Sequence, residues 1–388
     1  MLKNKNKTMQ HKKNTMIPGI PTKTLSLASV IGIVLLICGL AFHSSLLSVV
    51  AVFFVSTTVI GLIASVLLPI LVPLKASPYP PPDTIWSRGN YGISDHSGDN
   101  SRDYLEADTE SKATSLVNLR GKRGIIWLRT GSKLPNDIDL FVRDALPYLS
   151  GKTILLTTDG DLATSDLNPN VVSAILDNDN IVNWYTQNLS IGRDVNNQHK
   201  LHAFPIGLDL HAVNGTGPDE MWQIYQKIKS QHFVPWNQRT NMLLSDVHLT
   251  PSRCGTRERW RKAMSSINNT GRIQVLHKRV SRDSLWSNFY CRTRFVMSLP
   301  GNGLDCHRTY EAAFFGAVVV TNQSSPFKQL WRKMNVPVLY CNDQFTDVIQ
   351  VIDGYEKPTE DKLRFFTAQE WRQEMDALLY HPSTPNKQ

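Results

Sequence analysis

The last third of the chain places polar residues between two apolar segments, with a spacing that suits phosphate binding. Apolar residues 295–297 lead into the turn Gly301-Asn302-Gly303, where glycines let backbone amides approach a phosphate. Arg308 and Glu311 stand three apart on the helix expected next, so they share the face that points back toward the turn. We predict that Arg308 pairs with the diphosphate of a sugar nucleotide and that Glu311 accepts hydrogen bonds from its ribose. An ordinary surface ion pair is the alternative.

Three further residues extend this candidate donor site. His307 is a candidate hydrogen-bond donor to phosphate, although a plain loop histidine fits as well. Arg253 and Arg257 follow a strand expected at 242–244, a position where cations commonly meet a diphosphate leaving group. A solvated basic helix face is the alternative for both arginines.

Carboxylates that could act on an acceptor follow two expected strands in the first half of the folded region. Asp159 and Asp161 come after residues 153–156, and Asp209 comes after residues 201–206. Carboxylates at alternate positions can ligate Mn²⁺ or Mg²⁺, cap a helix or remove a proton. We favour Asp161 as a general base or acceptor contact, with Asp209 as the competing base.

Aromatic and amide side chains of the same half could line a sugar-binding cleft. The candidates are Trp184, Gln187 and Asn188, with the indole stacked on a pyranose, although core packing is the default for Trp184. The nearby histidines show no metal-ligand spacing, so a structural or acceptor-contacting role is expected for His199, His202 and His211.

Strands that alternate with helices are expected to position all of these residues. Such alternation predicts parallel sheets, with the loops after the strands forming the functional rim. We predict an α/β fold of two Rossmann-like domains that face a cleft. An acceptor domain is expected over residues 117–235, and a nucleotide-sugar domain over residues 236–388.

The charge balance gives a nucleic-acid role no support. The chain has 42 Lys and Arg residues against 33 Asp and Glu residues, but six of the lysines lie within residues 1–23, which contain no acidic residue. The remaining 36 basic groups nearly balance the acidic ones, so the high isoelectric point reflects mainly the N-terminus.

An uncharged, apolar stretch predicts that the chain is an integral membrane protein with the lipid bilayer as a partner. Residues 24–74 contain no charged side chain, and we favour two transmembrane helices over a single long anchor. The basic tail 1–23 is expected in the cytoplasm. Residues 75–116 are rich in Pro and then in Ser, Asp and Gly, which is typical of a stem or linker.

Two spans would return the folded region to the cytoplasmic side, and one span would place it in the lumen. Four glycosylation triplets weakly favour the lumen: Asn188, Asn214, Asn268 and Asn322. The cysteines leave two disulfides and four thiols equally open: Cys254, Cys291, Cys306 and Cys341.

Residues 298–311, Ser-Leu-Pro-Gly-Asn-Gly-Leu-Asp-Cys-His-Arg-Thr-Tyr-Glu, resemble the C-terminal signature of exostosin-like glycosyltransferases, glycosyltransferase family 47. The segments 155–161, 184–188 and 200–209 occur in the order that such proteins show upstream. The resemblance spans residues 120–345. It implies a GT-B fold, a donor held mainly by the C-terminal half, an acceptor held mainly by the N-terminal half, usually no essential metal, and a Golgi or endoplasmic reticulum membrane. Exostosin relatives commonly have one anchor, whereas two spans are expected here.

We therefore predict a membrane-anchored glycosyltransferase that transfers a sugar from a nucleotide-sugar donor to a hydroxyl group of a glycan or glycoconjugate. No cofactor is expected to be required, and a divalent metal is the less favoured possibility. One alternative is a catalytically inactive membrane-tethered module that binds glycans or partner proteins. The other is a metal-dependent GT-A transferase that uses Asp159 and Asp161.

Overall fold

The computed structural model describes residues 84–98, 109–131, 136–190, 197–211, 217–247, 255–267, 270–356 and 367–380. The expected tail 1–23 and transmembrane region 24–74 lie outside these ranges, as do Arg253, Asn214, Asn268 and Cys254. Within the described ranges, no helix has the length and apolarity needed to span a bilayer.

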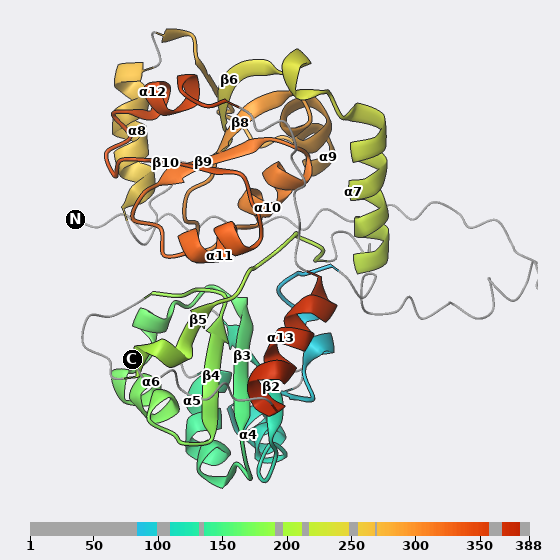
Figure 1. Cartoon of the computed structure of the whole chain (residues 1–388), viewed down its shortest axis with the longest axis vertical. Coiled ribbons are helices and arrows are strands. Elements are labelled where there is room, and N and C mark those ends of the chain that lie inside the picture. Colours follow the sequence, from blue (N-terminus) through green and yellow to red (C-terminus); the bar gives the residue numbers. More distant parts are fainter. Residues whose placement is uncertain are drawn as a thin grey trace, which may run out of the picture. The chain divides into compact units, whose positions relative to one another are not determined.

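The first sheet has five parallel strands in sequential order (Figure 1). They are β1 (His96–Ser97), β2 (Gly124–Gly131), β3 (Thr153–Gly160), β4 (Ile181–Thr186) and β5 (Leu201–Ala203). The central strands are buried on both faces, as their continuous apolar runs predict. In the ladder, Ile126 lies opposite Leu155, and Leu155 lies opposite Trp184.

The sequential strand order explains how the two faces of this sheet are covered. Right-handed crossovers between strands that advance in one direction place their helices on one face. The helices α4 (Thr109–Val117), α5 (Asp137–Asp144) and α6 (Pro169–Leu176) pack there, against a core that includes Ile126 and Leu155. The opposite face, with Trp127 and Tyr185, is covered by α13 (Ala368–Tyr380). Residues 368–380 thus pack on the first sheet, whereas the prediction placed them in the C-terminal domain, residues 236–388.

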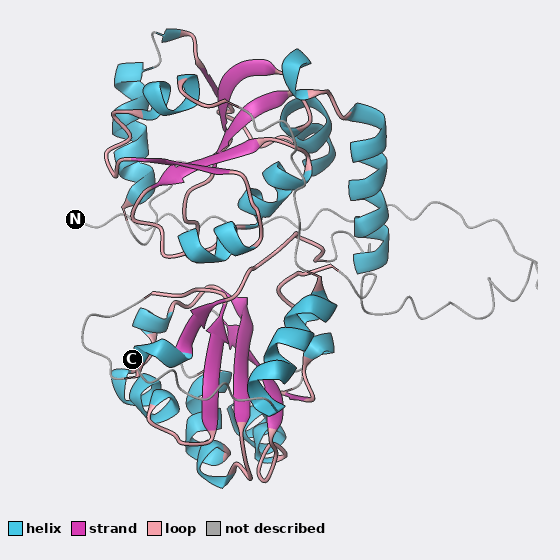
Figure 2. Ribbon diagram, viewed as in Figure 1, coloured by secondary structure: helices cyan, strands magenta, loops and turns pink. Residues whose placement is uncertain are grey.

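The second sheet is also parallel, and its strand order is β10-β9-β8-β6-β7. Its strands are β6 (Thr240–Ser245), β7 (Ile273–Val275), β8 (Thr293–Met297), β9 (Val318–Asn322) and β10 (Val338–Cys341). This is the doubly wound order 2-1-3-4-5, in which the chain changes direction across the sheet between β6 and β8. Figure 2 shows both sheets flanked by helices. The α/β class with two parallel sheets is therefore confirmed.

The helices associated with the second sheet include one irregular segment. They are α8 (Thr256–Ile267), α9 (Arg282–Ser284), the π-helix η7 (Leu285–Tyr290), α10 (His307–Phe314), α11 (Lys328–Lys333) and α12 (Val348–Asp353). Gly316 ends α10 with φ 83°, as expected for a residue that must adopt the left-handed region. Buried Arg239 donates to the carbonyls of Tyr290 and Phe315, and so ties η7 to the end of α10.

The helix α7 (Pro218–His232) packs against elements of the second half. Its Tyr225 ring lies 4.3 Å from the Trp286 ring and 5.7 Å from the Phe315 ring, measured between centroids. The division between the halves therefore precedes α7, whereas the sequence pattern placed it near residue 235. No helix was predicted over these residues, so the core that its apolar face joins was not predicted either.

The stretch 75–116, expected to be a linker, contributes to the fold in its described part. It contains the 3-10 helix η1 (Gly89–Ile93), β1 and α4. Trp86 is buried and forms a bridge with Gly207. The linker prediction is wrong for these residues because a polar composition hid three isolated apolar anchors, Ile85, Trp86 and Ile93.

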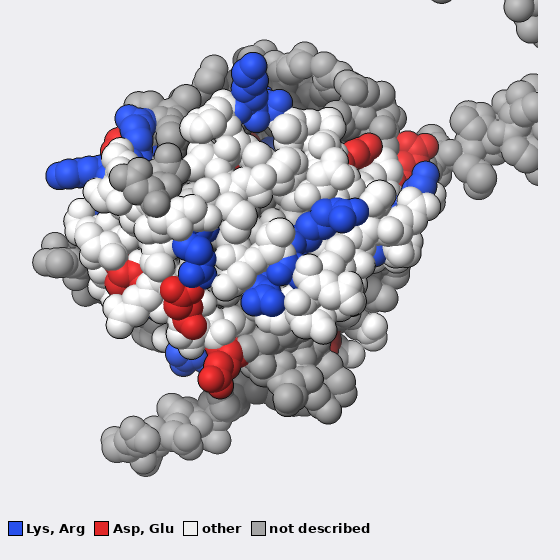
Figure 3. Space-filling model, turned by 90° about the horizontal axis from the view of Figure 1, so that it is seen from above, with Lys and Arg blue, Asp and Glu red and all other residues white. Residues whose placement is uncertain are grey.

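The described surface and cysteines bear on the remaining sequence predictions. On the face in Figure 3, basic and acidic side chains are scattered among uncharged ones, and no continuous basic area forms among the described residues. Asn188 and Asn322 are buried, which excludes them as exposed glycan acceptors in the folded chain. The three described cysteines, Cys291, Cys306 and Cys341, are free thiols.

Candidate functional site

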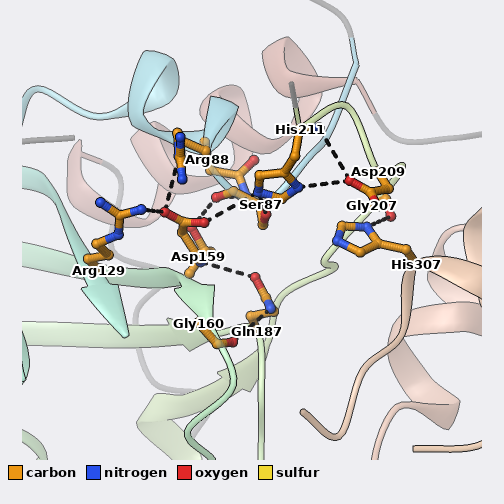
Figure 4. Close-up of polar contacts among 12 residues, drawn as sticks. Ser87, Arg88, Arg129, Asp159, Gly160, Gln187, Gly207, Asp209, His211 and His307 are labelled. Carbon is orange, nitrogen blue, oxygen red and sulfur yellow. Dashed lines mark hydrogen bonds and ion pairs between the residues drawn. The ribbon is translucent and has the colours of Figure 1, made fainter. Parts of the chain in front are cut away.

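Asp159 occupies the centre of a polar cluster at the carboxyl end of β3 (Figure 4). Its φ of 57° lies in the left-handed region, which is unusual for a residue with a side chain. One carboxylate oxygen accepts from Arg88 Nε at 3.2 Å and from Arg129 Nη2, and the other lies 3.4 Å from His211 Nε2. Three nitrogen-bearing groups, brought together from separate segments, therefore surround this carboxylate.

His211 joins Asp159 to Asp209. Its Nδ1 lies 2.9 Å from Asp209 Oδ1, while Nε2 faces both Asp159 and the Ser87 hydroxyl, the latter at 3.1 Å. Burial would lower the pKa of His211, but its hydrogen bonds to the two carboxylates and their charges raise it to about 9. The ring is therefore an imidazolium at neutral pH.

The two carboxylates bonded to His211, those of Asp159 and Asp209, are both ionised. Burial would raise the pKa of Asp159, but the hydrogen bond from His211 and the charges of Arg129 and Arg88 lower it to about 2. Asp209 also forms an ion pair with Arg282 of the second half. Against the effect of burial, His211 and neighbouring cations hold the pKa of Asp209 well below its usual range.

His307 reaches the same cluster from the first residue of α10. Its Nδ1 lies 2.8 Å from the carbonyl oxygen of Gly207, and its ring centroid lies 5.6 Å from that of His211. Gly207 has φ 70°, and a Cβ atom there would lie 2.0 Å from the carbonyl oxygen of Ile85. Only glycine therefore lets this carbonyl face His307.

Ser87, Arg129, Asp159, His211 and His307 line a cavity of about 290 Å³ to which both halves contribute. Asp161 and Gln187 line it beside the Asp159 cluster, and His307 lines it from α10. Gln187 accepts from the backbone N–H of Asp159 at 3.1 Å. Asp161 and Gln187 thus line the same cavity, and Asp209 adjoins it through His211; their role toward an acceptor stays a prediction.

The other two predicted acceptor residues have different surroundings. Trp184 is fully buried, and its indole donates to Thr157 Oγ1 at 2.9 Å. Asn188 is also fully buried and links the halves: its oxygen accepts from the backbone N–H groups of Leu304 and Asp305, and its amide donates to Gly160. An acceptor contact is therefore wrong for Trp184, where the core-packing alternative is confirmed, and wrong for Asn188.

Arg308, predicted to bind the donor diphosphate, pairs with a carboxylate at the switch point of the second sheet. Arg308 Nε lies 2.7 Å from Asp246 Oδ1, just after β6, and Tyr290 donates to the second oxygen of this carboxylate at 2.9 Å. Burial would lower the pKa of Arg308, but the Asp246 charge outweighs it and raises that pKa. Arg308 is therefore a part-buried cation whose charge is already paired with a carboxylate.

Glu311 faces the interior and not the turn. It is buried and accepts from the Tyr225 hydroxyl at 2.7 Å, and burial raises its pKa to about 7. The spacing of Arg308 and Glu311 predicted that both side chains point back toward the turn, whereas Glu311 contacts Tyr225 of α7. The spacing did not show that α7 and η7 cover this face of α10.

Arg257 and the glycine-rich turn lie together as predicted. Arg257 Nε donates to the Pro300 carbonyl at 3.0 Å, and a Cβ on Gly301 would lie 3.2 Å from its Nη2. Asn302 is exposed at the tip of the turn. Gly303 is required for another reason, because a Cβ there would lie 2.7 Å from Asn188 Oδ1.

Within the described ranges, a metal ion could be held by Asp209, His211 and His307, whose ligand atoms lie within 4.8 Å of one another. This set contains neither Asp159 nor Asp161. Arg282 already pairs with Asp209, and both ring nitrogens of His211 have carboxylate partners. The donor set therefore fits a metal ion poorly. His199 is exposed, and His202 packs against Tyr185, away from this cluster.

Several residues of the site were not found from the sequence. Ser87 and Arg88 lie in the expected linker, Arg129 lies within an apolar strand, and Arg282 and Asp246 come from the second half. The one usable signal was position, because Asp246 directly follows the first strand of the second sheet.

No family model matches the chain, and no curated protein sequence matches it. Among solved structures, the chain is similar to α,α-trehalose 6-phosphate synthase from Burkholderia multivorans, with 13% identity over 70% of this chain and 69% of that chain and a TM-score of 0.38. It is also similar to a UDP-forming α,α-trehalose-phosphate synthase from Burkholderia xenovorans in complex with glucose-6-phosphate, with 12% identity over 71% and 73% and a TM-score of 0.37. Similarity this low assigns no activity to this chain.

Proposed function

We propose that the chain is a glycosyltransferase that moves a sugar from a nucleotide-sugar donor to an acceptor hydroxyl. One observation carries the proposal: the β6/β8 switch point of the doubly wound second sheet adjoins, through α10, a polar cavity at the strand ends of the first sheet. Ligands of such sheets bind outside the carboxyl ends of the strands at the switch point. The arrangement supports a donor there and an acceptor in the cavity.

For the donor, we assign the diphosphate to Arg257 and the glycine-rich turn. Arg257 lies in the first turn of α8, whose amino end carries a partial positive charge that favours phosphate. The contact between Arg257 and residues 300–301 places a cation beside backbone groups of the turn. The same charges would stabilise the departing nucleoside diphosphate, and we propose that no metal is required.

Arg308 has a supporting role in this proposal. Its ion pair with Asp246 connects the start of α10 to the end of β6, so it fixes both sides of the switch point. Removal of either partner would leave a part-buried charge without compensation, and the cost of about 3–5 kcal/mol for a fully buried pair is its upper limit.

For the acceptor, we assign the cavity at the end of β3. Its size is near the lower limit of about 300 Å³ for ligand sites, and its polar lining suits a hydroxyl-rich sugar unit. Asp161, Gln187 and the two histidines supply the hydrogen-bonding groups.

Calorimetry with UDP and GDP tests the donor assignment. The full chain is expected to bind one of these nucleotides, and Arg257→Ala is expected to weaken binding at least tenfold. Arg261→Ala removes an exposed arginine one turn further along α8 and is expected to change little. Equal losses in both variants would contradict the assignment.

The inactive, partner-binding module is the second candidate, favoured by one observation. Arg308 and Glu311, the residues expected to hold the donor, both have internal partners. Absence of any nucleotide binding by the wild-type chain would support this candidate over the enzyme.

We further propose, from the uncharged residues 24–74 and the exostosin-like signature, a membrane-anchored enzyme of the Golgi or endoplasmic reticulum that acts on a glycan or glycoconjugate. Fractionation after carbonate extraction tests the anchor: recovery of the full chain in the soluble fraction would contradict it. Protease protection of intact vesicles distinguishes the lumenal from the cytoplasmic placement.

A further inference from the structure

The ring of His307 has a fixed tautomer. The Gly207 carbonyl oxygen only accepts hydrogen bonds, so the Nδ1 atom that lies 2.8 Å away must carry the hydrogen. In the neutral ring, Nε2 then carries a lone pair. Figure 4 shows the bond to Gly207 on one side of the ring and the other nitrogen directed into the space beside Gln187 and His211.

The neighbouring groups of the cavity are poor proton acceptors by comparison. His211 is bonded to carboxylates through both ring nitrogens. Asp159 accepts from two arginines, and Asp209 accepts from His211 and Arg282. Among these four groups, the lone pair available to an incoming hydroxyl belongs to His307.

We propose that His307 is the general base of the transfer and that its Nε2 accepts the proton of the acceptor hydroxyl. This inference rests on the glycosyl transfer proposed above. As the proton moves to Nε2, the acceptor oxygen forms a bond to the anomeric carbon of the donor. The bond from that carbon to the diphosphate oxygen breaks, and the nucleoside diphosphate leaves with the electron pair. A single displacement of this kind inverts the anomeric configuration.

The charges around His307 suit this task. Burial and the cations His211 and Arg282 lower its pKa, so the ring is neutral before reaction. Asp209 has the opposite effect and stabilises the imidazolium once it forms. The product proton is thus held beside a carboxylate, as general-base catalysis requires.

Asp161 is the competing base, since it lines the same cavity. His307→Asn separates the two possibilities, because the Asn amide retains a donor near the position of Nδ1 and so keeps a partner for Gly207, while Nε2 is lost. The matched control is His199→Gln, which alters an exposed histidine outside the cavity.

With a nucleotide sugar that the wild-type chain turns over, His307→Asn is expected to lower kcat by about 10²–10⁴-fold. UDP or GDP affinity and the melting temperature are expected to stay unchanged, and the acidic limb of the pH profile is expected to disappear. The product should have the inverted configuration. The proposal would be overturned if His307→Asn kept its rate within about threefold, or if the product had the retained configuration. Loss of activity in Asp161→Asn but not in His307→Asn would also overturn it.

A second measurement does not depend on turnover. In the full chain labelled with ¹⁵N-histidine, the long-range NMR pattern at pH 7 should show His307 with hydrogen on Nδ1 only, and His211 with hydrogen on both nitrogens. Hydrogen on Nε2 of His307 would overturn its assignment as base, even if nucleotide sugars are substrates. Conversely, failure of every nucleotide sugar to bind would overturn the proposed function and leave the NMR result unaffected.

Discussion

At the scale of single residues, the cavity is organised by an alternation of charge. Asp159 and Asp209 are ionised, and the imidazolium of His211 lies between them. The sequence indicated Asp209 and the Asp159-Gly160-Asp161 segment as candidates because they follow strands. It could not show which oxygens face arginines, because Arg88 and Arg282 come from distant segments.

This charge pattern predicts a pH-dependent contribution of His211 to stability. The folded pKa of about 9 exceeds the ordinary value of 6.5, so the contribution is fully present below pH 6.5 and disappears as the pH rises through 9. We expect His211→Gln to lower the unfolding free energy by roughly 1–3 kcal/mol at pH 6 and to have little further effect above pH 9.5. Urea denaturation at both pH values measures this, with His199→Gln as the control. A constant difference across that range would contradict the pKa assignment.

Gly207 gives a second residue-scale prediction. Gly207→Ala would place a Cβ 2.0 Å from the Ile85 carbonyl oxygen at φ 70°, whereas Gly121→Ala has the same φ with no atom within 4 Å. The conformational cost common to both is about 1–2 kcal/mol. Gly207→Ala is expected to lower the melting temperature much further than Gly121→Ala, since backbone must move. Equal melting temperatures would show that the contact is not tight.

At the scale of elements, the chain's periodicity predicted the parallel strands but not the partners of all helices. Apolar runs such as Ile125 to Leu128 indicate strands buried on both faces. The strand order is set by which strands pair across long connections, and no local pattern reports that. For the same reason, the predicted boundary near residue 235 placed α7 with the first domain and α13 with the second, whereas α7 packs against Trp286 and α13 against Phe204.

The role of α13 can be tested by one substitution. Trp371 is buried and packs against Phe204 and Tyr185, with ring centroids 4.8 Å and 6.0 Å apart. Trp371→Ala is expected to cost about 3–5 kcal/mol of unfolding free energy. Gln373→Ala, an exposed position on the same helix, should stay within about 0.5 kcal/mol. If Trp371→Ala were equally mild, α13 would not be part of the first core.

At the scale of the whole folded region, a few buried hydrogen bonds connect the strand ends of the first sheet to the loop that precedes α10. Asn188 holds the backbone of Leu304 and Asp305, and Asp305 accepts from the Ile206 N–H at 2.9 Å. The sequence showed both sets of polar residues but assigned Asn188 to a ligand. Contacts between residues 99 to 117 positions apart carry no local signature.

Asn188→Ala is expected to loosen this connection, because each buried amide left without a partner costs about 1–3 kcal/mol. Hydrogen exchange should accelerate at the amides of Leu304 and Asp305 and at few sites elsewhere. Asn302→Ala, at the exposed tip of the turn, provides the control. Unchanged exchange at Leu304 and Asp305 would show that Asn188 does not hold them.

The most direct test of the central claim is the release of nucleoside diphosphate when the full chain is offered a panel of nucleotide sugars with glycan acceptors. The account predicts that one donor is turned over, that Arg257→Ala abolishes most of this turnover, and that Arg261→Ala preserves it. A wild-type chain that neither binds nor releases nucleoside diphosphate from any member of the panel would contradict the account.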